Sequence, residues 1–221
     1  MSNETVFTLE AMHVDVFVLR DAEVGVPGMV AANVGPHVSV LSAGEAHLSH
    51  PTQGLLDALT VLQRKGQCDG LSIAIVGDIR HSRVARSALH GLRALGAGDL
   101  RVCGPAELMP ESVPGAEVFD DVDRALEGAD VVMALRLQKE RMAQAMIPGE
   151  AEYFRRYGLT AERMRKAARD AIVMHPGPMN RGVEIDSDVA DGPWSVILDQ
   201  VANGVAVRMA VLYLLAGGDE G

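Results

Sequence analysis

The chain has 221 residues, of which 48% are hydrophobic and 23% are charged, a composition that excludes a disordered protein and suits one large or two small domains. Its formal net charge of -10 argues against nucleic acid or an anionic membrane as a partner. No apolar run looks long enough to span a bilayer, and the N-terminus lacks the pattern of a signal peptide. Cys68 and Cys103 indicate neither a zinc site nor a disulfide framework. We therefore expect a cytoplasmic protein without a metal site.

Strands and helices are predicted to alternate along the chain. Short apolar runs predict strands at Val14–Leu19, which ends at Arg20, and at His37–Leu41, Leu71–Val76, Leu100–Cys103, Val131–Leu135 and Ala171–Met174, with a short segment at Val118. Helical spacing predicts helices at Glu4–Met12, Met29–Asn33, Thr52–Lys65, Ser82–Leu95, Val122–Leu126, Ala161–Arg169 and Leu198–Leu215. The charged stretch 136–160 reads as a long loop with helical pieces. This order favours an α/β fold with parallel sheets flanked by helices.

The first part of the chain is expected to form an incomplete domain. It opens in mid-helix and offers only two strands before residue 52, which is thin for an independent sheet. We expect one domain in residues 1–66, a second in residues 67–197, and a C-terminal helix in residues 198–221 that packs back on the first domain.

Four polar segments interrupt the apolar pattern where strands end. They are H-P-T-Q at His50–Gln53, G-D-I-R-H-S-R at Gly77–Arg83, R-L-Q-K-E-R at Arg136–Arg141 and H-P-G-P-M-N-R-G at His175–Gly182. Open α/β sheets bind ligands at the carboxyl ends of their strands. Three of the segments supply arginine, which suits a two-pronged contact with carboxylate or phosphate. The sequence therefore predicts a site for a small, highly anionic ligand pair.

His50 precedes a predicted helix, so its imidazole would lie near the helix N-terminus, where free N–H groups attract anions and the neutral ring is favoured. A neutral ring could donate a hydrogen bond to a carbonyl oxygen, and Gln53 could hold an amide-like group nearby. A loop histidine that caps a turn is the alternative. Further along, Arg80, Arg83 and Arg86 are expected to share one helix face. Taken alone, these arginines are more typical of a solvated basic face, and a dinucleotide site lacks its G-x-G-x-x-G glycines.

Arg136 and Gln138 stand two residues apart after a strand, so they are expected to point the same way and to suit a dicarboxylate. An interdomain salt-bridge patch is the alternative for residues 139–141. Two prolines flank Gly177 and would fix a loop that offers backbone carbonyls to a substrate. His175 is interpreted as a structural residue of this loop.

Together these segments resemble the aspartate carbamoyltransferases of the transcarbamylase family, which act in pyrimidine biosynthesis. The likeness runs over nearly the whole chain, through V-D-V-F-V-L-R, S-H-P-T-Q-G-L-L-D, G-D-I-R-H-S-R, R-L-Q-K-E-R-M, M-H-P-G-P-M-N-R-G-V-E-I and Q-V-A-N-G-V-A-V-R-M-A. H-P-T-Q and H-P-G-P are similar to the aspartate-specific members, whereas ornithine-specific relatives typically have a cysteine in both motifs. The resemblance implies a transcarbamylase fold with a partial carbamoyl-phosphate-binding domain at 1–66 and an aspartate-binding domain at 67–197.

The resemblance also implies roles for individual residues. Arg20 and His50 would be catalytic and would contact carbamoyl phosphate together with Gln53 and the backbone at Gly177 and Pro178. The residues expected to bind L-aspartate are Arg83, Arg136 and Gln138. The amine of aspartate would attack the carbonyl carbon, the oxyanion would be stabilised by Arg20 and His50, and phosphate would leave, with no cofactor. A homotrimer is implied, and regulatory or dihydroorotase-type subunits are conceivable partners.

The chain departs from the family pattern in its first part. The family's S-T-R-T-R phosphate-binding loop and its Ser/Lys loop are not found in this sequence, and A-G-E-A replaces the usual A-G-D-G. We therefore expect an N-terminally truncated chain whose activity alone is in question, with apolar sheet edges exposed. The alternative is a non-catalytic homologue that binds aspartate or assembles with a complete catalytic chain.

Overall fold

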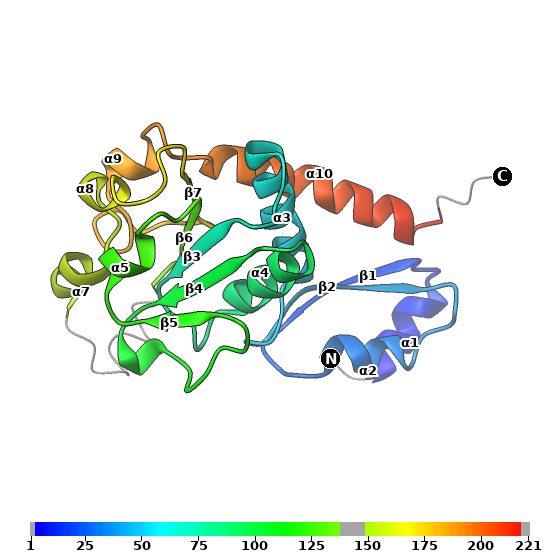
Figure 1. Ribbon diagram of the computed structural model, residues 1–221. Helices are drawn as coiled ribbons and strands as arrows, with labels where there is room; N and C mark the ends of the chain where they lie inside the picture. The colour runs from blue at the N-terminus through cyan, green and yellow to red at the C-terminus, as the bar shows by residue number, and fades with distance from the viewer. Residues whose placement is uncertain (1–2, 138–148, 218–221) are drawn as a thin grey trace.

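A computed structural model describes residues 3–137 and 149–217 and contains two parallel sheets with helices around them (Figure 1). The helices are α1 Asn3–Ala11, α2 Val26–Ala31, α3 Pro51–Lys65, α4 Arg83–Ala94, η1 Ala106–Leu108, α5 Val122–Leu126, α7 Glu150–Tyr157, α8 Ala161–Met164, α9 Ser187–Ala190 and α10 Ile197–Leu215. The strands are β1 Val16–Asp21, β2 Ser39–Glu45, β3 Ser72–Val76, β4 Asp99–Cys103, β5 Glu117–Phe119, β6 Val131–Ala134 and β7 Ile172–Met174. The predicted α/β fold with parallel sheets flanked by helices is confirmed.

The N-terminal sheet has two parallel strands, β1 and β2, and one covered face. Phe17 and Leu19 of β1 point into a small core that α1 and α2 complete, whereas Val18 between them is 56% exposed. The predicted buried strand is therefore buried on one face only, because nothing within the described residues covers the other. Between Leu19 and Asp21 the pairing shifts from Ser42 to Glu45, so β2 carries one extra residue there, a bulge.

The second sheet has five parallel strands in the order β5-β4-β3-β6-β7. The chain moves from β3 outward through β4 to β5, then returns to the other side of β3 for β6 and β7. The order therefore reverses between β3 and β6, and ligands of open α/β sheets bind outside the strand ends at such a switch point. The segments that leave β3 and β6 are in close contact there, because a Cβ added at Gly77 would lie 2.9 Å from Cβ of Leu135.

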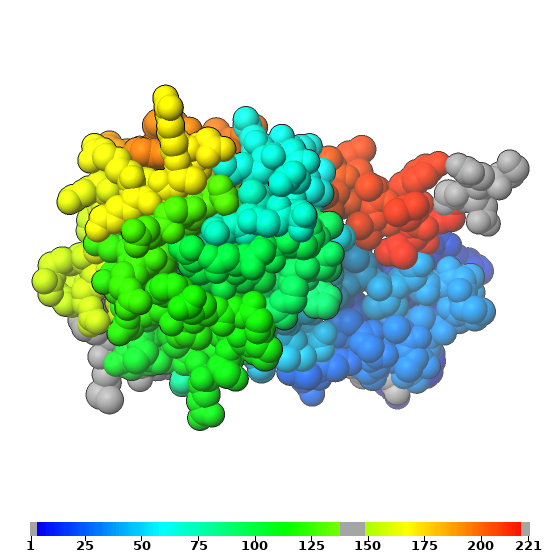
Figure 2. Space-filling view, in the orientation of Figure 1, coloured from blue at the N-terminus to red at the C-terminus, as the bar shows by residue number. Residues whose placement is uncertain are grey.

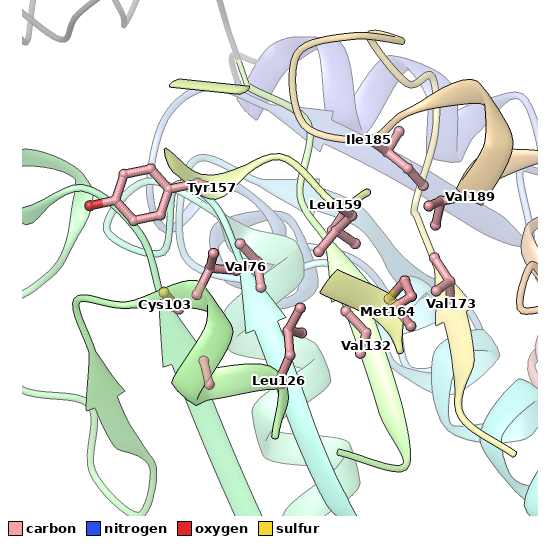
Figure 3. Packing of buried hydrophobic residues seen from close by; sticks show 14 of the residues in the cluster. Val76, Cys103, Leu126, Val132, Tyr157, Leu159, Met164, Val173, Ile185 and Val189 are labelled. Carbon is pink, nitrogen blue, oxygen red and sulfur yellow. The ribbon is translucent and has the colours of Figure 1, made fainter. Parts of the chain in front are cut away.

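Apolar side chains cover both faces of this sheet, which explains why its strands read as continuous apolar runs. One cluster lies under α5, α7, α8 and α9 and includes Val76, Val132, Leu159 and Met164 (Figure 3). The other lies under α3 and α4 and includes Ile75 and further residues such as Leu89, Leu92 and Met133.

Helix α3 joins the two sheets, since it follows β2 and precedes β3 and packs against both α4 and α10. Pro51 occupies its first turn and Gly66, with a φ of 77°, ends it. Its contact with α10 is polar as well as apolar: Nδ2 of Asn203 donates to Oγ1 of Thr60 at 2.9 Å, and Arg64 pairs with Asp199. The C-terminal helix thus packs on α3 (Figure 1), while the domain boundaries expected from the sequence stay a prediction.

Within the described residues one helix, α10, is long and apolar enough by length and composition to cross a membrane, so the expectation that no such run exists is wrong. Its polar residues Gln200 and Asn203 are buried against α3, where both are hydrogen-bonded. Large apolar side chains elsewhere on this helix are exposed, namely those of Leu198, Val201, Val205, Met209, Leu212, Tyr213, Leu214 and Leu215. The contacts with α3 give α10 a packing role that length and composition do not reveal.

Several predicted elements differ from those observed. The second strand lies at Ser39–Glu45 rather than His37–Leu41, and helix α9 was not predicted. The helix predicted at Ala161–Arg169 ends at Met164, because N–H of Ala168 donates to the carbonyl of Ala129 at 3.0 Å instead of continuing the helix. This bond leads the chain into β7, and only the tertiary structure provides its acceptor.

The contact between α3 and α4 depends on a glycine. A Cβ at Gly54 would lie 2.8 Å from the carbonyl oxygen of Ser87. We expect Gly54→Ala to lower the free energy of unfolding by about 1–3 kcal/mol in urea titrations, because the backbones must move apart. Gly91→Ala is the control, since its Cβ would meet Gly54 at an ordinary 3.6 Å. Equal losses in the two variants would contradict this close contact as the cause.

Candidate active site

Loops after β1, β2, β3, β6 and β7 and the start of α3 surround a cleft of about 1000 Å³. Seven of the residues predicted to bind ligands line this cleft: Arg20, His50, Gln53, Arg83, Arg136, Gly177 and Pro178. The eighth, Gln138, lies outside the described residues. Figure 2 shows the N-terminal part of the chain and the part that contains the larger sheet as neighbouring lobes, and the cleft takes residues from both. The individual roles assigned to these residues stay predictions.

The cleft concentrates positive charge in a chain with a net charge of -10. Its described lining contains four arginines, the three predicted ones and Arg208 of α10, against the carboxylates of Asp21 and Asp78. Sequence reasoning missed Arg208, although it lies within the quoted segment Q-V-A-N-G-V-A-V-R-M-A. Asp78 is buried and accepts from the backbone N and Nδ1 of His81 at 3.1 and 2.9 Å. Four guanidinium groups in one cleft favour a ligand with several negative charges.

His50 caps α3 and is held there by its backbone N–H, which donates to Oγ of Ser87 at 2.8 Å. Its ring atom Nδ1 is buried without a hydrogen-bond partner. Burial is the first cause that lowers the pKa of His50 to about 4, followed by the charges of Arg83, Arg208 and Arg20. The ring is therefore neutral at pH 7 and can offer one N–H to a carbonyl oxygen.

Arg83 is the first residue of α4, yet the N-terminal sheet positions its side chain. Nη1 of Arg83 donates to the carbonyl of Ala46 at 3.1 Å. Gly44, with a φ of 127°, lies so close that a Cβ there would be 3.0 Å from Cζ and Nη1 of Arg83. The bulge in β2 thus makes room for a guanidinium that belongs to the second sheet's helix.

The predicted common face of three arginines is wrong. Ser82 caps α4 through its side chain, which accepts from N of Ala85, so the helix begins at Arg83 and Arg80 precedes it. The guanidinium of Arg80 donates to the carbonyl of Met109 at 3.0 and 2.7 Å, and Arg86 donates to the carbonyl of Arg80. Of the three, Arg83 alone lines the cleft within the described part of the chain.

The loop after β7 is held by a buried histidine. Nδ1 of His175 accepts from N of Gly177 at 2.9 Å, and Nε2 faces Oε1 of Glu184 at 3.2 Å. Since Nδ1 accepts a hydrogen bond, the ring proton is on Nε2, which donates a hydrogen bond to Glu184. His175 is not among the cleft-lining residues, whereas Pro176, Gly177 and Pro178 are. The geometry is that of a loop-fixing residue, as the sequence interpretation had it.

The described residues contain no group of three or more His, Cys, Asp or Glu side chains that could hold a metal ion. Cys68 and Cys103 are buried and free. The cleft is lined by arginine, imidazole, amide, carboxylate, hydroxyl and backbone groups.

Known proteins are similar to this chain in sequence and in fold. A family model described as aspartate/ornithine carbamoyltransferase, Asp/Orn binding domain, matches residues 69–215. An aspartate transcarbamoylase from Trypanosoma cruzi in complex with phosphate is similar at 29% identity and a TM-score of 0.82, over 98% of this chain and 71% of that one. Its complex with N-(phosphonacetyl)-L-aspartic acid is similar at 29% identity and a TM-score of 0.82, over 98% of this chain and 70% of that one. An ornithine carbamoyltransferase from Pyrococcus furiosus is similar at 28% identity and a TM-score of 0.85, over 99% of this chain and 71% of that one.

A doubly wound sheet with an arginine-lined cleft at its strand ends defines a class of open α/β proteins. The similar structures narrow this class to carbamoyl-transferring enzymes. Because the family model matches well over half of the sequence, the chain belongs to the aspartate/ornithine carbamoyltransferase family. The expected resemblance is confirmed at this level.

The lowered pKa of His50 predicts how stability changes with pH. Protonation favours the unfolded chain, whose histidine has the higher pKa, so the contribution of His50 is complete above pH 6.5 and falls as the pH drops towards 4. We expect His50→Gln to lose less unfolding free energy than the parent between pH 7 and pH 5, measured in urea. The matched control is His90→Gln, a change at an exposed histidine of α4. This variant should lose as much unfolding free energy between pH 7 and pH 5 as the parent does. Parallel pH profiles for all three proteins would contradict the argument.

Proposed function

We propose that the cleft binds carbamoyl phosphate and L-aspartate and transfers the carbamoyl group to the amine of aspartate, giving N-carbamoyl-L-aspartate and phosphate. The observation that carries the proposal is the meeting of a neutral histidine, an amide and four arginines in one cleft. The Trypanosoma cruzi relative has been solved in complex with carbamoyl phosphate and aspartate, which supports this ligand pair.

The carbamoyl group is assigned to the wall formed by Arg20, His50, Gln53 and the turn at Gly177–Pro178. When the amine attacks the carbonyl carbon, negative charge develops on the carbonyl oxygen. The N–H of neutral His50 and the guanidinium of Arg20 stabilise that oxyanion. Phosphate leaves as the C–O bond breaks and takes up the proton that the attacking nitrogen releases. The protein supplies orientation and electrostatic stabilisation, so no covalent intermediate with the chain is required.

The two carboxylates of aspartate are assigned to Arg83 and Arg136, with Gln138 as a further contact that remains a prediction outside the described residues. Ornithine is the competing substrate, since a relative of that specificity matches equally well in structure. Ornithine carries one carboxylate and a cationic side chain. A cleft with four arginines repels the additional cationic amine of ornithine, which aspartate lacks, so the cleft favours aspartate.

The test of the proposal is a calorimetric titration with N-(phosphonacetyl)-L-aspartic acid, combined with an assay for carbamoyl-aspartate. We expect the analogue to bind, and we expect added aspartate, but not added ornithine, to weaken that binding. The assay should also detect turnover. Binding without turnover would favour the alternative of a non-catalytic homologue that binds aspartate or complements a complete chain. A folded protein that binds neither phosphate nor the bisubstrate analogue would overturn the proposal.

Two arginines of α4 provide a matched pair. Arg83 lines the cleft, whereas Arg86, one turn further, does not. We expect Arg83→Ala to weaken binding of the bisubstrate analogue by about 10–100-fold, because a charge-assisted hydrogen bond is lost. Arg86→Ala should change it by less than about twofold, as befits an exposed charge outside the cleft. Equal losses in both variants would mean that the overall field, not a contact of Arg83, attracts the ligand.

Assembly and location are part of the same proposal. A homotrimer in the cytoplasm, alone or with regulatory or dihydroorotase-type subunits, is proposed from the family resemblance. Sedimentation of the purified chain, with and without the bisubstrate analogue, tests the trimer: a monomer in both conditions would contradict it.

A further inference from the structure

A buried carboxylate lies behind the cleft. Asp57 of α3 is fully buried, one helical turn after Gln53. Its Oδ1 accepts two hydrogen bonds, from Nε2 of Gln53 at 2.9 Å and from Nε2 of Gln200 at 2.7 Å. Its Oδ2 has no hydrogen-bond partner. A single oxygen thus holds two side-chain amides, one from α3 and one from α10.

The orientation of the Gln200 amide follows from its other partner. The backbone N–H of His175 can only donate, so the atom that faces it at 2.9 Å must be the carbonyl oxygen Oε1 of Gln200. The NH₂ group of Gln200 therefore faces Asp57. Donor and acceptor assignments at both ends of this amide agree, which fixes its orientation.

The same reasoning applies to Gln53, which also lines the cleft. Asp57 engages Nε2 of Gln53, so Oε1 is the acceptor that Gln53 can present to a ligand. An acceptor at this place suits the NH₂ group of a carbamoyl ligand. If the amide of Gln53 were reversed, its NH₂ group would face the NH₂ group of the carbamoyl ligand, and the hydrogen bond between them would be lost.

Hydrogen bonds continue from Gln200 to the opposite wall of the site. Gln200 holds N–H of His175, and the ring of His175 holds the turn at Gly177. Through Glu184 and Asn180 the contacts reach the carbonyl of Leu137, next to the cleft arginine Arg136. Asp57 therefore connects the start of α3 with the loop after β7.

We propose that Asp57 is a positioning residue for carbamoyl transfer: it orients the amide of Gln53 towards the carbamoyl NH₂ and, through Gln200, holds the loop that carries Gly177 and Pro178. The inference rests on the proposed function. Burial raises the pKa of Asp57 to about 7, partly offset by hydrogen bonds from Gln200 and Gln53. The two amides thus stabilise a carboxylate whose burial is costly.

Asp57→Leu removes the acceptor and Asp57→Asn keeps one, because an asparagine places its oxygen towards the two NH₂ groups. The probe is phosphonacetamide, a stable analogue of carbamoyl phosphate that retains the NH₂ group, and inorganic phosphate is the probe without it. We expect Asp57→Leu to weaken phosphonacetamide binding by about tenfold. Phosphate binding should change by less than about twofold in the same variant, and Asp57→Asn should retain both affinities.

Thr60→Val is the matched control. Thr60 is equally buried, lies one turn further along α3 and shares the contact between the helices, but its hydrogen bonds join it to Leu56 and Asn203 rather than to the cleft residue Gln53. A merely structural role for Asp57 predicts equal effects of Asp57→Leu and Thr60→Val on phosphonacetamide binding, and that result would overturn the proposal. If Asp57→Leu does not fold, Asp57→Ala takes its place.

A second readout needs no ligand. Hydrogen exchange of the His175 amide should speed up by about tenfold or more in Asp57→Leu and stay unchanged in Thr60→Val, because Gln200 loses its anchor only in the former. Unchanged exchange in Asp57→Leu would overturn the proposed link to the loop. Failure of the parent protein to bind either probe would instead reject the proposed function, and the exchange result would still decide whether Asp57 holds this loop.

Discussion

The seam that α3 forms with α4 and α10 is the constraint on which the rest of the molecule depends. On one side Gly54 allows the backbones of α3 and α4 to approach, and on the other Asp57 and Thr60 bind α10 through buried hydrogen bonds. Because α3 follows β2 and precedes β3, this seam sets how the two sheets face each other. The cleft lies at the beginning of the same helix, and the loops that form its walls follow strands of the two sheets that this helix joins.

Charge in the cleft is organised by burial and by neighbouring arginines. Burial, and after it the charges of Arg83, Arg208 and Arg20, lowers the pKa of His50 to about 4, so the neutral ring can donate a hydrogen bond near pH 7. Behind it, Oδ1 of Asp57 accepts hydrogen bonds from the amides of Gln53 and Gln200, so this oxygen positions neutral side chains. The arrangement separates charge for ligand binding from polarity for positioning.

The strands of the larger sheet could be predicted from the sequence because both of their faces are apolar, as Ile73–Ala74 and Val131–Val132 illustrate. The ends of other elements could not. Helix α8 stops where N–H of Ala168 donates to the carbonyl of Ala129, and β2 contains a bulge where Gly44 lies beside Arg83. Both depend on partners far away in the chain, which local periodicity does not contain.

The sequence by itself determined the α/β fold, the family and seven of the residues that line the cleft, because strand ends and polar motifs are local features. Only the tertiary structure decided which arginines share the cleft. In the structure Arg80 donates to the carbonyl of Met109, outside the cleft, and Arg208 of α10 lines the cleft instead. It also gave Asp57 its partners, since Gln200 is distant in sequence and meets α3 only when the C-terminal helix packs. Contacts between distant elements depend on packing geometry, which residue spacing along one element cannot specify.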